Sequence, residues 1–415
     1  MKILFIGGYF DKNQEKEIIE KTITSVDIAG NRFQEYFIQG FAESNLVTEL
    51  KILSAPLINT WPNGYKDFYF RGFREENKAP ENLKYVHFLN IWALRNIFRT
   101  KALKKVIYNS RFYEKDDEEK VVILYCPHTP FLKAANYIKK LNPRIKTCMI
   151  VPDLPHYMNL SDKVSFAYKI LKKIDIHFFY KECNQIDSFI LITEQMKSIL
   201  KIRERPYKVI ECIYGQKNKE ILNDTKREII LQSLNLSSKC KNIVYTGKLA
   251  IKFGLLNLLK AFSLIEDDNI RLVLCGNGDA VDEIKRAAVK DKRIIFKGQV
   301  SSNDATDICR TATVLINPRQ NNEEYTKYSF PSKIFEYLAT GLPVISYKLD
   351  GMPDIYKDFL YIPESESIDD LAKMIKYVLD LDKDIASQKT KKALEYLEAS
   401  RTPVVVANQL VDFLK

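Results

Sequence analysis

Short apolar runs alternate with helical patterns along almost the whole chain, and this rhythm restricts the possible fold more than any other feature. In the N-terminal half, the apolar runs expected to form strands are 3–6, 48–52, 84–88, 121–125, 148–151 and 189–191. Helical patterns stand between several of them, including 31–43 and 131–140. Such alternation predicts parallel sheets that are covered by helices on both faces. The expected fold class is therefore α/β.

The second half of the chain repeats the rhythm at shorter intervals. Its apolar runs lie at 243–247, 271–275, 294–296 and 314–317, and its helical patterns at 255–265, 280–289 and 304–310. A chain of 415 residues exceeds one ordinary hydrophobic core, so two domains are expected. We predict two Rossmann-like domains that face a central cleft, the first over 1–205 and the second over 206–396. A polar helical linker is expected over 217–233.

Composition narrows the classes of protein that remain. The first apolar run is too short for a signal peptide or a membrane span, and no run of 18 apolar residues occurs elsewhere. Seven cysteines are scattered without CxxC spacing, which is typical of a reduced cytoplasmic protein without a zinc site. The four histidines show no metal-binding spacing. We expect a cytoplasmic protein that requires neither a metal nor another cofactor.

Positive charge is concentrated in one region of the first domain. The formal net charge is +11, and residues 91–181 hold 18 Lys/Arg against 8 Asp/Glu. Within 91–112, apolar residues intermingle with Arg95, Arg99, Lys101, Lys104 and Lys105 at helical spacing. This pattern fits a helix on an anionic membrane surface, and it fits equally a solvated helix with a core-facing stripe. Nucleic acid is disfavoured because no helix-turn-helix, RRM or zinc-finger spacing accompanies the charge.

The most specific segment spans 317–344, between an apolar run and the next one at 343–346. A polar loop leads to Pro331 and Ser332, where a short helix is expected to begin, and Gly341 marks its end. A helix N-terminus at the carboxyl edge of a parallel sheet is a ready phosphate site. Glu336 lies one turn inside this helix, and its carboxylate can accept two hydroxyl hydrogen bonds. Phosphate and sugar hydroxyls together indicate a nucleotide.

The tract PSKIFEYLATGLPVI resembles the donor-binding segment of the retaining GT-B glycosyltransferases of family four, also called group 1. NPR…NEEYTKYSFPSK resembles a branch found in bacterial capsule and exopolysaccharide clusters, and the similarity extends over nearly the whole chain. The resemblance implies that Glu336 holds the ribose hydroxyls of a nucleotide sugar. The first glutamate of the family's Glu-x7-Glu pattern would fall at Tyr328, so the chain departs from the family there. The resemblance also implies that the helix within 397–415, expected to start near 404, packs back on the first domain.

Further donor-binding residues follow the strand expected at 243–247. The family places a basic residue after the glycine at this point, and Gly247-Lys248 match it. A second family lysine would fall one place after Lys252, which is therefore a second, weaker candidate. A fixed ammonium would stabilise the negative charge that develops on the departing nucleotide diphosphate. A solvated loop charge is the alternative for each lysine.

Four more residues are candidates for the same donor site. Arg319 follows the strand at 314–317 and could bind phosphate in bidentate fashion. Ser332 and Lys333 stand at the expected helix start, where Ser332 could also act as a simple cap. Gly278 belongs to a GxG after the strand at 271–275, but the third small residue of a dinucleotide fingerprint is missing. A tight turn is the alternative for that glycine.

The first domain offers candidates for the acceptor side. His128 follows the strand at 121–125, at a point where related glycosyltransferases often have a histidine that touches the donor sugar. Asp153 follows the strand at 148–151, Asn31 and Gln34 begin the first long helix, and Gly8 follows the first strand. A structural role is the alternative for His128, and ordinary loop polarity is the alternative for the others.

The predicted function is that of a metal-independent hexosyltransferase. It would move a sugar from a nucleotide-diphosphate sugar to a lipid-linked saccharide, with retention by resemblance, in cell-surface polysaccharide synthesis. Glu336, Lys248 and His128 are the predicted catalytic residues. A polyprenyl-linked acceptor and an anionic membrane surface are the expected partners, which would place the enzyme at the inner face of the cell membrane. The alternatives are a nucleotide-sugar epimerase of the same fold, a non-enzymatic two-lobed sugar-binding protein and an NAD-dependent oxidoreductase, which would need the GxGxxG motif that the sequence lacks.

Overall fold

The computed structural model describes residues 1–24, 26–74, 79–115, 117–155, 166–215, 224–234, 236 and 238–415. The chain forms two compact units, of which unit 1 is Met1–Ile213 with Thr402–Lys415 and unit 2 is Tyr214–Arg401. The boundaries expected at 205/206 and 396/397 lie a few residues before these positions. Part of the expected linker, 217–223, lies outside the described residues, and helix α7 covers Asp224–Ser233.

Unit 1 is built on a parallel sheet whose described strands follow the order β4-β2-β1-β6-β7-β8-β9. These strands are β1 (Lys2–Gly7), β2 (Glu49–Ser54), β4 (Leu83–Tyr85), β6 (Lys120–Tyr125), β7 (Lys146–Val151), β8 (Ser188–Leu191) and β9 (Tyr207–Val209). A separate antiparallel pair joins β3 (Tyr69–Phe70) to β5 (Phe88–Leu89). The central strands β1 and β6 are buried along almost their whole length, as expected of strands covered on both faces.

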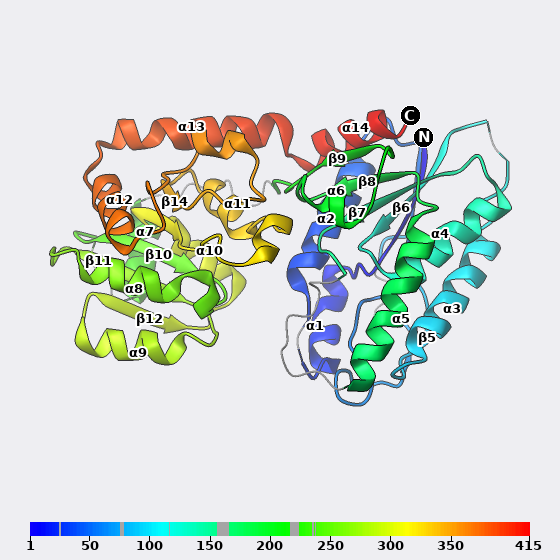
Figure 1. Ribbon diagram of the computed structural model, residues 1–415, viewed down its shortest axis with the longest axis horizontal. Coiled ribbons are helices and arrows are strands. Elements are labelled where there is room, and N and C mark those ends of the chain that lie inside the picture. The colour runs from blue at the N-terminus through cyan, green and yellow to red at the C-terminus, as the bar shows by residue number, and fades with distance from the viewer. Residues whose placement is uncertain are drawn as a thin grey trace. The chain divides into compact units, whose positions relative to one another are not determined.

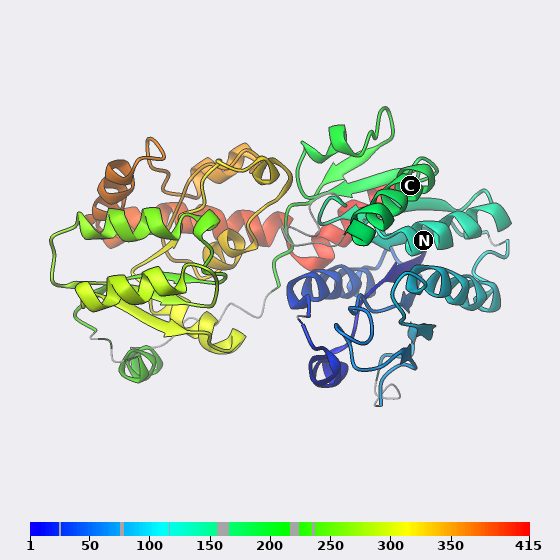
Figure 2. The same cartoon turned by 60° about the horizontal axis from the view of Figure 1, so that its bottom comes forward.

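The helices of unit 1 lie on the two faces of this sheet. They are α1 (Lys12–Lys21), α2 (Ile28–Glu43), α3 (Arg95–Ser110), α4 (Thr129–Leu141), α5 (Phe166–Cys183), α6 (Met196–Ile199) and α14 (Pro403–Leu414). Helix α4 packs against both α3 and α5, and the three helices lie beside one another in Figures 1 and 2.

The C-terminal helix α14 packs on α2 in unit 1, and both views show the red helix against the blue one (Figures 1 and 2). Gly40 makes the close approach possible, since a Cβ atom there would lie 2.1 Å from the Pro403 carbonyl oxygen. Ser44 Oγ donates to Asn408 Oδ1 at 2.6 Å beside this contact. The far end of α14 buries Leu410 and its apolar neighbours in the core of unit 1.

Unit 2 contains a second parallel sheet, whose described strands follow the order β12-β11-β10-β13-β14. The strands are β10 (Lys241–Thr246), β11 (Ile270–Cys275), β12 (Ile294–Gly298), β13 (Val314–Asn317) and β14 (Val344–Ser346). The remaining helices are α8 (Leu255–Ser263), α9 (Val281–Lys290), α10 (Ser302–Arg310), α11 (Ser332–Leu338), α12 (Ile368–Asp380) and α13 (Lys383–Ser400). Short 3-10 turns are η3 (Ile251–Phe253), η4 (Glu324–Tyr328) and η5 (Asp354–Asp358).

The predicted α/β class with two Rossmann-like domains is confirmed, since each unit is a parallel sheet with helical connections. One strand prediction is wrong: residues 84–88 are divided between β4, in the parallel sheet, and β5, in the antiparallel pair. In the part of the chain that the structure describes, no helix is long and apolar enough to cross a membrane. All seven cysteines are free thiols, and all but Cys240 are buried.

The basic segment 91–112 forms α3, but its charges are not all on the surface. Arg99 is only 1% exposed and packs in the core beside Leu103 and Ile107. The expected basic face therefore loses Arg99, which periodicity alone assigned to the surface. Lys101 and Lys105 remain exposed.

Candidate functional site

The sheet of unit 2 changes direction between β10 and β13, which places a crevice at their carboxyl ends. From β10 the chain moves outward to β11 and β12, and it then returns to the other side of β10 with β13 and β14. Ligands in open α/β sheets bind outside the carboxyl ends of the strands at such a switch point. Lys248 follows β10 and Arg319 follows β13, so both lie at this position.

Glycines interlock the loops after β10 and β11. Gly247 and Gly276 both have a φ of +140°, and a Cβ atom on Gly276 would lie 1.7 Å from the Gly247 carbonyl oxygen. A Cβ atom on Gly278 would lie 2.2 Å from the carbonyl oxygen of Leu249. The predicted donor residues Gly247 and Gly278 therefore allow two backbones to pack closely, and this packing fixes the backbone around Lys248.

Three cations at this edge have no carboxylate partner among the described residues. The side chain of Lys248 is exposed and forms no ion pair there. The Lys252 ammonium lies 5.4 Å from the centroid of the Tyr325 ring, and the Arg319 guanidinium lies 4.6 Å from the same centroid. A concentration of unpaired positive charge at a switch point is suited to a diphosphate.

Arg319 is the most buried of these cations, with 8% of its surface exposed. Its Nη2 donates to Ser329 Oγ at 2.8 Å, whereas its buried Nε has no partner among the described residues. Burial lowers the pKa of Arg319, but a guanidinium keeps its charge in proteins. Arg319 therefore braces the loop that carries Tyr325 and Ser329 and adds a positive charge to the crevice.

Helix α11 brings Glu336 to the same edge. Lys333 Nζ donates to Glu336 Oε2 at 2.6 Å, and the stem of Lys333 lies over Gly247, with Cε 3.4 Å from the position of a Cβ on that glycine. The other carboxylate oxygen, Oε1, has no protein partner among the described residues. Glu336 is thus held in place by one oxygen and can accept hydrogen bonds with the other.

The start of α11 differs from the expectation for Ser332. Pro331 occupies the N-cap position, and Ser332 is the first helical residue, exposed and without a side-chain cap bond. The suggested role of Ser332 as the cap is therefore wrong, because the proline restricts the backbone one position earlier. Ser332 remains at the helix start, beside Lys333.

Tyr337 was not singled out from the sequence, yet it joins α11 to the end of β10. Its fully buried hydroxyl accepts from Thr246 N at 2.9 Å and donates to the Thr246 carbonyl oxygen at 3.1 Å. This contact fixes the helix that carries Glu336 relative to the strand that precedes Lys248. The sequence signal that could have identified Tyr337 is its position directly after Glu336 in the short helix.

Tyr328, at the position of the missing family glutamate, is the last residue of η4. The nearby carboxylates of Glu323 and Glu324 belong to exposed residues at the start of this turn.

The sheet of unit 1 has its own switch point, between β1 and β6. The Gly8 N–H after β1 donates to Gln34 Oε1 at 2.9 Å. Asn31 Oδ1 accepts from Phe10 N, and its Nδ2 donates to the Phe10 carbonyl oxygen, both at 2.9 Å. The side-chain amides of Asn31 and Gln34 thus hold the loop after β1. Their expected contacts with the acceptor substrate stay predictions.

His128 follows β6 and stands at the N-cap position of α4. Arg99 Nη1 lies 2.9 Å from His128 Nε2, and Arg99 Nη2 donates to the Pro56 carbonyl oxygen at 2.8 Å. Desolvation, followed by the charges of Arg99 and Arg95, lowers the pKa of His128 well below its usual value. His128 is therefore a neutral imidazole at physiological pH.

Asp153 follows β7, the neighbour of β6 in the sheet. Although the residue as a whole is exposed, desolvation of its carboxyl group and, second, the charge of Asp27 together raise its pKa to about 6. A carboxyl group with such a pKa can exchange a proton near neutral pH. Asp27 itself caps α2, because its Oδ1 accepts from Gly30 N at 2.8 Å.

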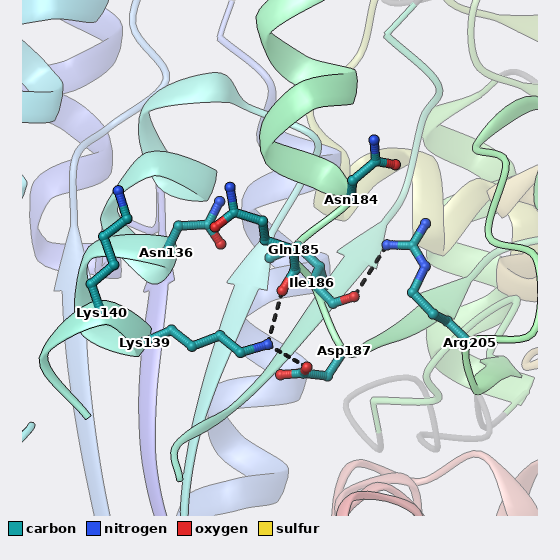
Figure 3. A pocket seen from close by; sticks show the side chains of 8 residues that line it. All are labelled: Asn136, Lys139, Lys140, Asn184, Gln185, Ile186, Asp187 and Arg205. Carbon is teal, nitrogen blue, oxygen red and sulfur yellow. Dashed lines mark hydrogen bonds and ion pairs between the residues drawn. The ribbon is translucent and has the colours of Figure 1, made fainter. Parts of the chain in front are cut away.

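A polar recess of unit 1 lies away from all of these residues (Figure 3). It is lined by the end of α4 and the segment that precedes β8, and Arg205 and Lys139 donate there to backbone carbonyl oxygens. Because α4 ends and β8 begins here, the recess is at the amino edge of the strands, opposite the carboxyl edge where ligands of such sheets bind. None of the predicted site residues lines it.

Comparison with known proteins gives a family match in the second half of the chain and structural matches over almost its whole length. Residues 226–395 match the model of the family "Glycosyl transferases group 1", and this range includes all eight predicted donor-binding residues. The matched range lies within unit 2. The match supports the expected enzyme class, a glycosyltransferase. A search of curated proteins gave no match.

Three solved structures resemble the chain over almost its full length. They are the sucrose-phosphate synthase of Thermosynechococcus elongatus (14% identity, TM-score 0.64, 99% of this chain and 98% of that chain), HepE of Anabaena in complex with UDP (15%, 0.62, 100% and 99%) and WaaG, a glycosyltransferase involved in lipopolysaccharide biosynthesis (13%, 0.59, 100% and 100%). At these identities the likeness establishes the fold, which is GT-B as expected.

Proposed function

We propose that the protein transfers a sugar from a nucleotide-diphosphate sugar to a saccharide acceptor. The observation that carries this proposal is the set of cations at the β10/β13 switch point, Lys248, Lys252 and Arg319, which lack carboxylate partners among the described residues. A diphosphate would supply the missing negative charge. The complex of HepE with UDP makes a uridine nucleotide the first candidate.

Each donor-site residue has a role in this proposal. The free Oε1 of Glu336, with Oε2 held by Lys333, would accept the ribose hydroxyls. Lys248 would bind the diphosphate and stabilise the charge that develops as the glycosidic bond breaks. Lys252, Arg319 and the backbone at Ser332 would complete the anion site. We propose that no metal takes part, because the cations suffice to neutralise a diphosphate.

We further propose that unit 1 presents the acceptor, with His128 and Asp153 close to it. Transfer would proceed with retention, and the acceptor hydroxyl would pass its proton to the departing diphosphate. This part rests on family resemblance, and Tyr328 in place of the family glutamate leaves the contact to the donor sugar to other groups. A lipid-linked saccharide of cell-surface polysaccharide is the proposed acceptor, as WaaG acts in lipopolysaccharide biosynthesis.

The experiment that tests this proposal follows donor and product by NMR. Purified protein is incubated with UDP-glucose or UDP-N-acetylglucosamine, with and without a membrane extract that contains lipid-linked saccharides. Transfer that requires the extract and gives a product with the donor's anomeric configuration supports the proposal. Epimerisation of the donor without acceptor would establish the epimerase alternative, and binding without turnover under all conditions would favour the sugar-binding protein.

Membrane association is a separate proposal that rests on α3 and α5, the two helices of unit 1 that both pack on α4. Ile97, at the start of α3, is 51% exposed, and Ile174 on α5 is 47% exposed. Other exposed apolar residues near them are Trp92, Leu94, Ile170, Leu171 and Phe178. Exposed lysines flank both groups, among them Lys101 and Lys105 on α3 and Lys173 on α5. Apolar side chains bordered by lysines match the interface of an anionic membrane.

Vesicle flotation tests the membrane surface. Each lysine near an anionic membrane contributes about 1 kcal/mol, so Lys101→Glu with Lys105→Glu should weaken binding to anionic vesicles by roughly 30-fold or more. Lys376→Glu with Lys391→Glu, on exposed sites of α12 and α13, is the matched control. Equal flotation with neutral and anionic lipid, or equal losses for both double variants, would contradict the proposal.

A further inference from the structure

The buried guanidinium of Arg99 is unusual because no carboxylate lies against it among the described residues. Its neighbours are the Pro56 carbonyl oxygen, the His128 ring and the face of Phe88, whose centroid is 4.3 Å from the guanidinium carbon. Its Nε is buried without a partner. A buried charge loses its hydration, and this cost must be offset by other interactions. An apolar side chain of similar size would fill the same space without that cost. The contact with His128 is therefore the feature to explain.

The chemistry of this contact fixes the protonation state of the imidazole. A guanidinium has only donors and does not lose its proton, so Arg99 Nη1 must donate to His128 Nε2. Nε2 then accepts with its lone pair, and the single ring proton lies on Nδ1. Nδ1 has no hydrogen-bond partner among the described residues, and it is not among their fully buried polar atoms.

We propose that Arg99 is a positioning residue that holds His128 as a fixed hydrogen-bond donor, with Nδ1–H directed to an oxygen atom of the saccharide substrate. This inference rests on the proposed function for the identity of the ligand, whereas the tautomer follows from the Arg99 contact alone. It excludes a role for His128 as a general base, because the only lone pair of the ring is engaged by Arg99.

The charged and titratable groups around His128 agree with this assignment. Helix α3 contributes Arg95 and Arg99, whose charges both disfavour an imidazolium. Strand β6 contributes Cys126, whose thiol stays protonated because burial raises its pKa. Asp27 and Asp153 act on Cys126 and not on His128. No described group therefore favours a second proton on the ring.

The test is a long-range 1H–15N correlation spectrum of the histidine rings in the full-length protein, recorded from pH 5 to pH 8. His128→Gln identifies the His128 signals by their loss, and His177→Gln, at an exposed site on α5, is the control. The expected wild-type spectrum has a protonated Nδ1, an unprotonated Nε2 and no titration in this range. A protonated Nε2, or titration near pH 6.5, would overturn the inference.

Two variants of Arg99 separate positioning from general stability. Arg99→Lys retains a donor for Nε2 and should preserve the wild-type tautomer, whereas Arg99→Met removes the donor and should allow the tautomer with its proton on Nε2. His128→Gln keeps an acceptor for Arg99 but lacks a donor at the Nδ1 position. It should lower kcat for UDP-glucose turnover by roughly tenfold, the size expected for one hydrogen bond, and leave the Kd for UDP unchanged.

The outcomes separate the role of His128 from the proposed function of the protein. An unchanged kcat in His128→Gln, with the predicted tautomer in the wild type, would overturn the donor role of His128. Absence of binding of both UDP and GDP in the wild type and in every variant would contradict the proposed function, and the tautomer would still be decided by the wild-type spectrum.

Discussion

Replacement of Gly276 by alanine tests whether the interlocked loops of unit 2 position the donor site. In Gly276→Ala, the new Cβ would lie 1.7 Å from the carbonyl oxygen of Gly247 and 2.9 Å from its carbonyl carbon. Both atoms belong to the backbone, so the loop before Lys248 must move. Gly298 is a matched control, because its φ is also positive, at +68°, and nothing lies within 4 Å of the new Cβ.

The two variants should differ in both stability and affinity. Gly298→Ala has only the backbone penalty of a left-handed conformation, about 1–2 kcal/mol. Gly276→Ala adds overpacking against backbone and should lose about 3 kcal/mol or more. Chemical denaturation gives the free energy of unfolding, and calorimetry with UDP gives the affinity, which should fall at least tenfold in Gly276→Ala alone. Equal stability losses with equal UDP affinity would refute the proposed link between Gly276 and the Lys248 loop.

Three further predictions address the charges and the packing. Lys248→Ala should weaken UDP binding by roughly 10- to 100-fold, as expected for one charge-assisted hydrogen bond, whereas Lys376→Ala on α12 should bind UDP like the wild type in the same titration. His128 is neutral in the folded protein because its pKa is lowered there. Its contribution to the free energy of unfolding is therefore fully present above the pKa of about 6.5 that it has in the unfolded chain. Below that pH the contribution falls by about 1.4 kcal/mol per pH unit. The difference in unfolding free energy between wild type and His128→Gln should follow this slope, and a flat difference would contradict the assignment. Gly40→Val should cost about 3 kcal/mol or more through its clash with the Pro403 backbone, measured by thermal unfolding, and an unchanged free energy of unfolding would contradict the close contact of α2 with α14.

The sequence predicted the strands well where they are buried on both faces. β1, β6 and β10 read as continuous apolar runs because helices cover both faces of a parallel sheet. β9 was not predicted, since its three residues are only half-buried and its pattern is weak. The segment 84–88 was expected to form one strand, because nothing in such a short run indicates that the chain leaves the parallel sheet after β4 and joins the antiparallel pair at β5.

The candidate site was predictable only in part. Strand ends located Lys248, Arg319 and His128, because residues after parallel strands share one edge of the sheet. Arg99 was assigned to a surface face because helical periodicity treats arginine as polar, and only tertiary packing reveals its contact with His128. Likewise, nothing in the sequence distinguished an Asn31 amide that binds a ligand from one that binds the backbone of Phe10.

Calorimetric titration of UDP and GDP into the wild type and into Glu336→Ala tests the central claim most directly. Glu395→Ala, an exposed glutamate on α13 of the same unit, is the control. The account predicts that the wild type and the control bind one nucleoside diphosphate and that Glu336→Ala loses this binding. Binding of neither nucleotide, or binding that is unaffected in Glu336→Ala, would contradict the assignment of the donor site.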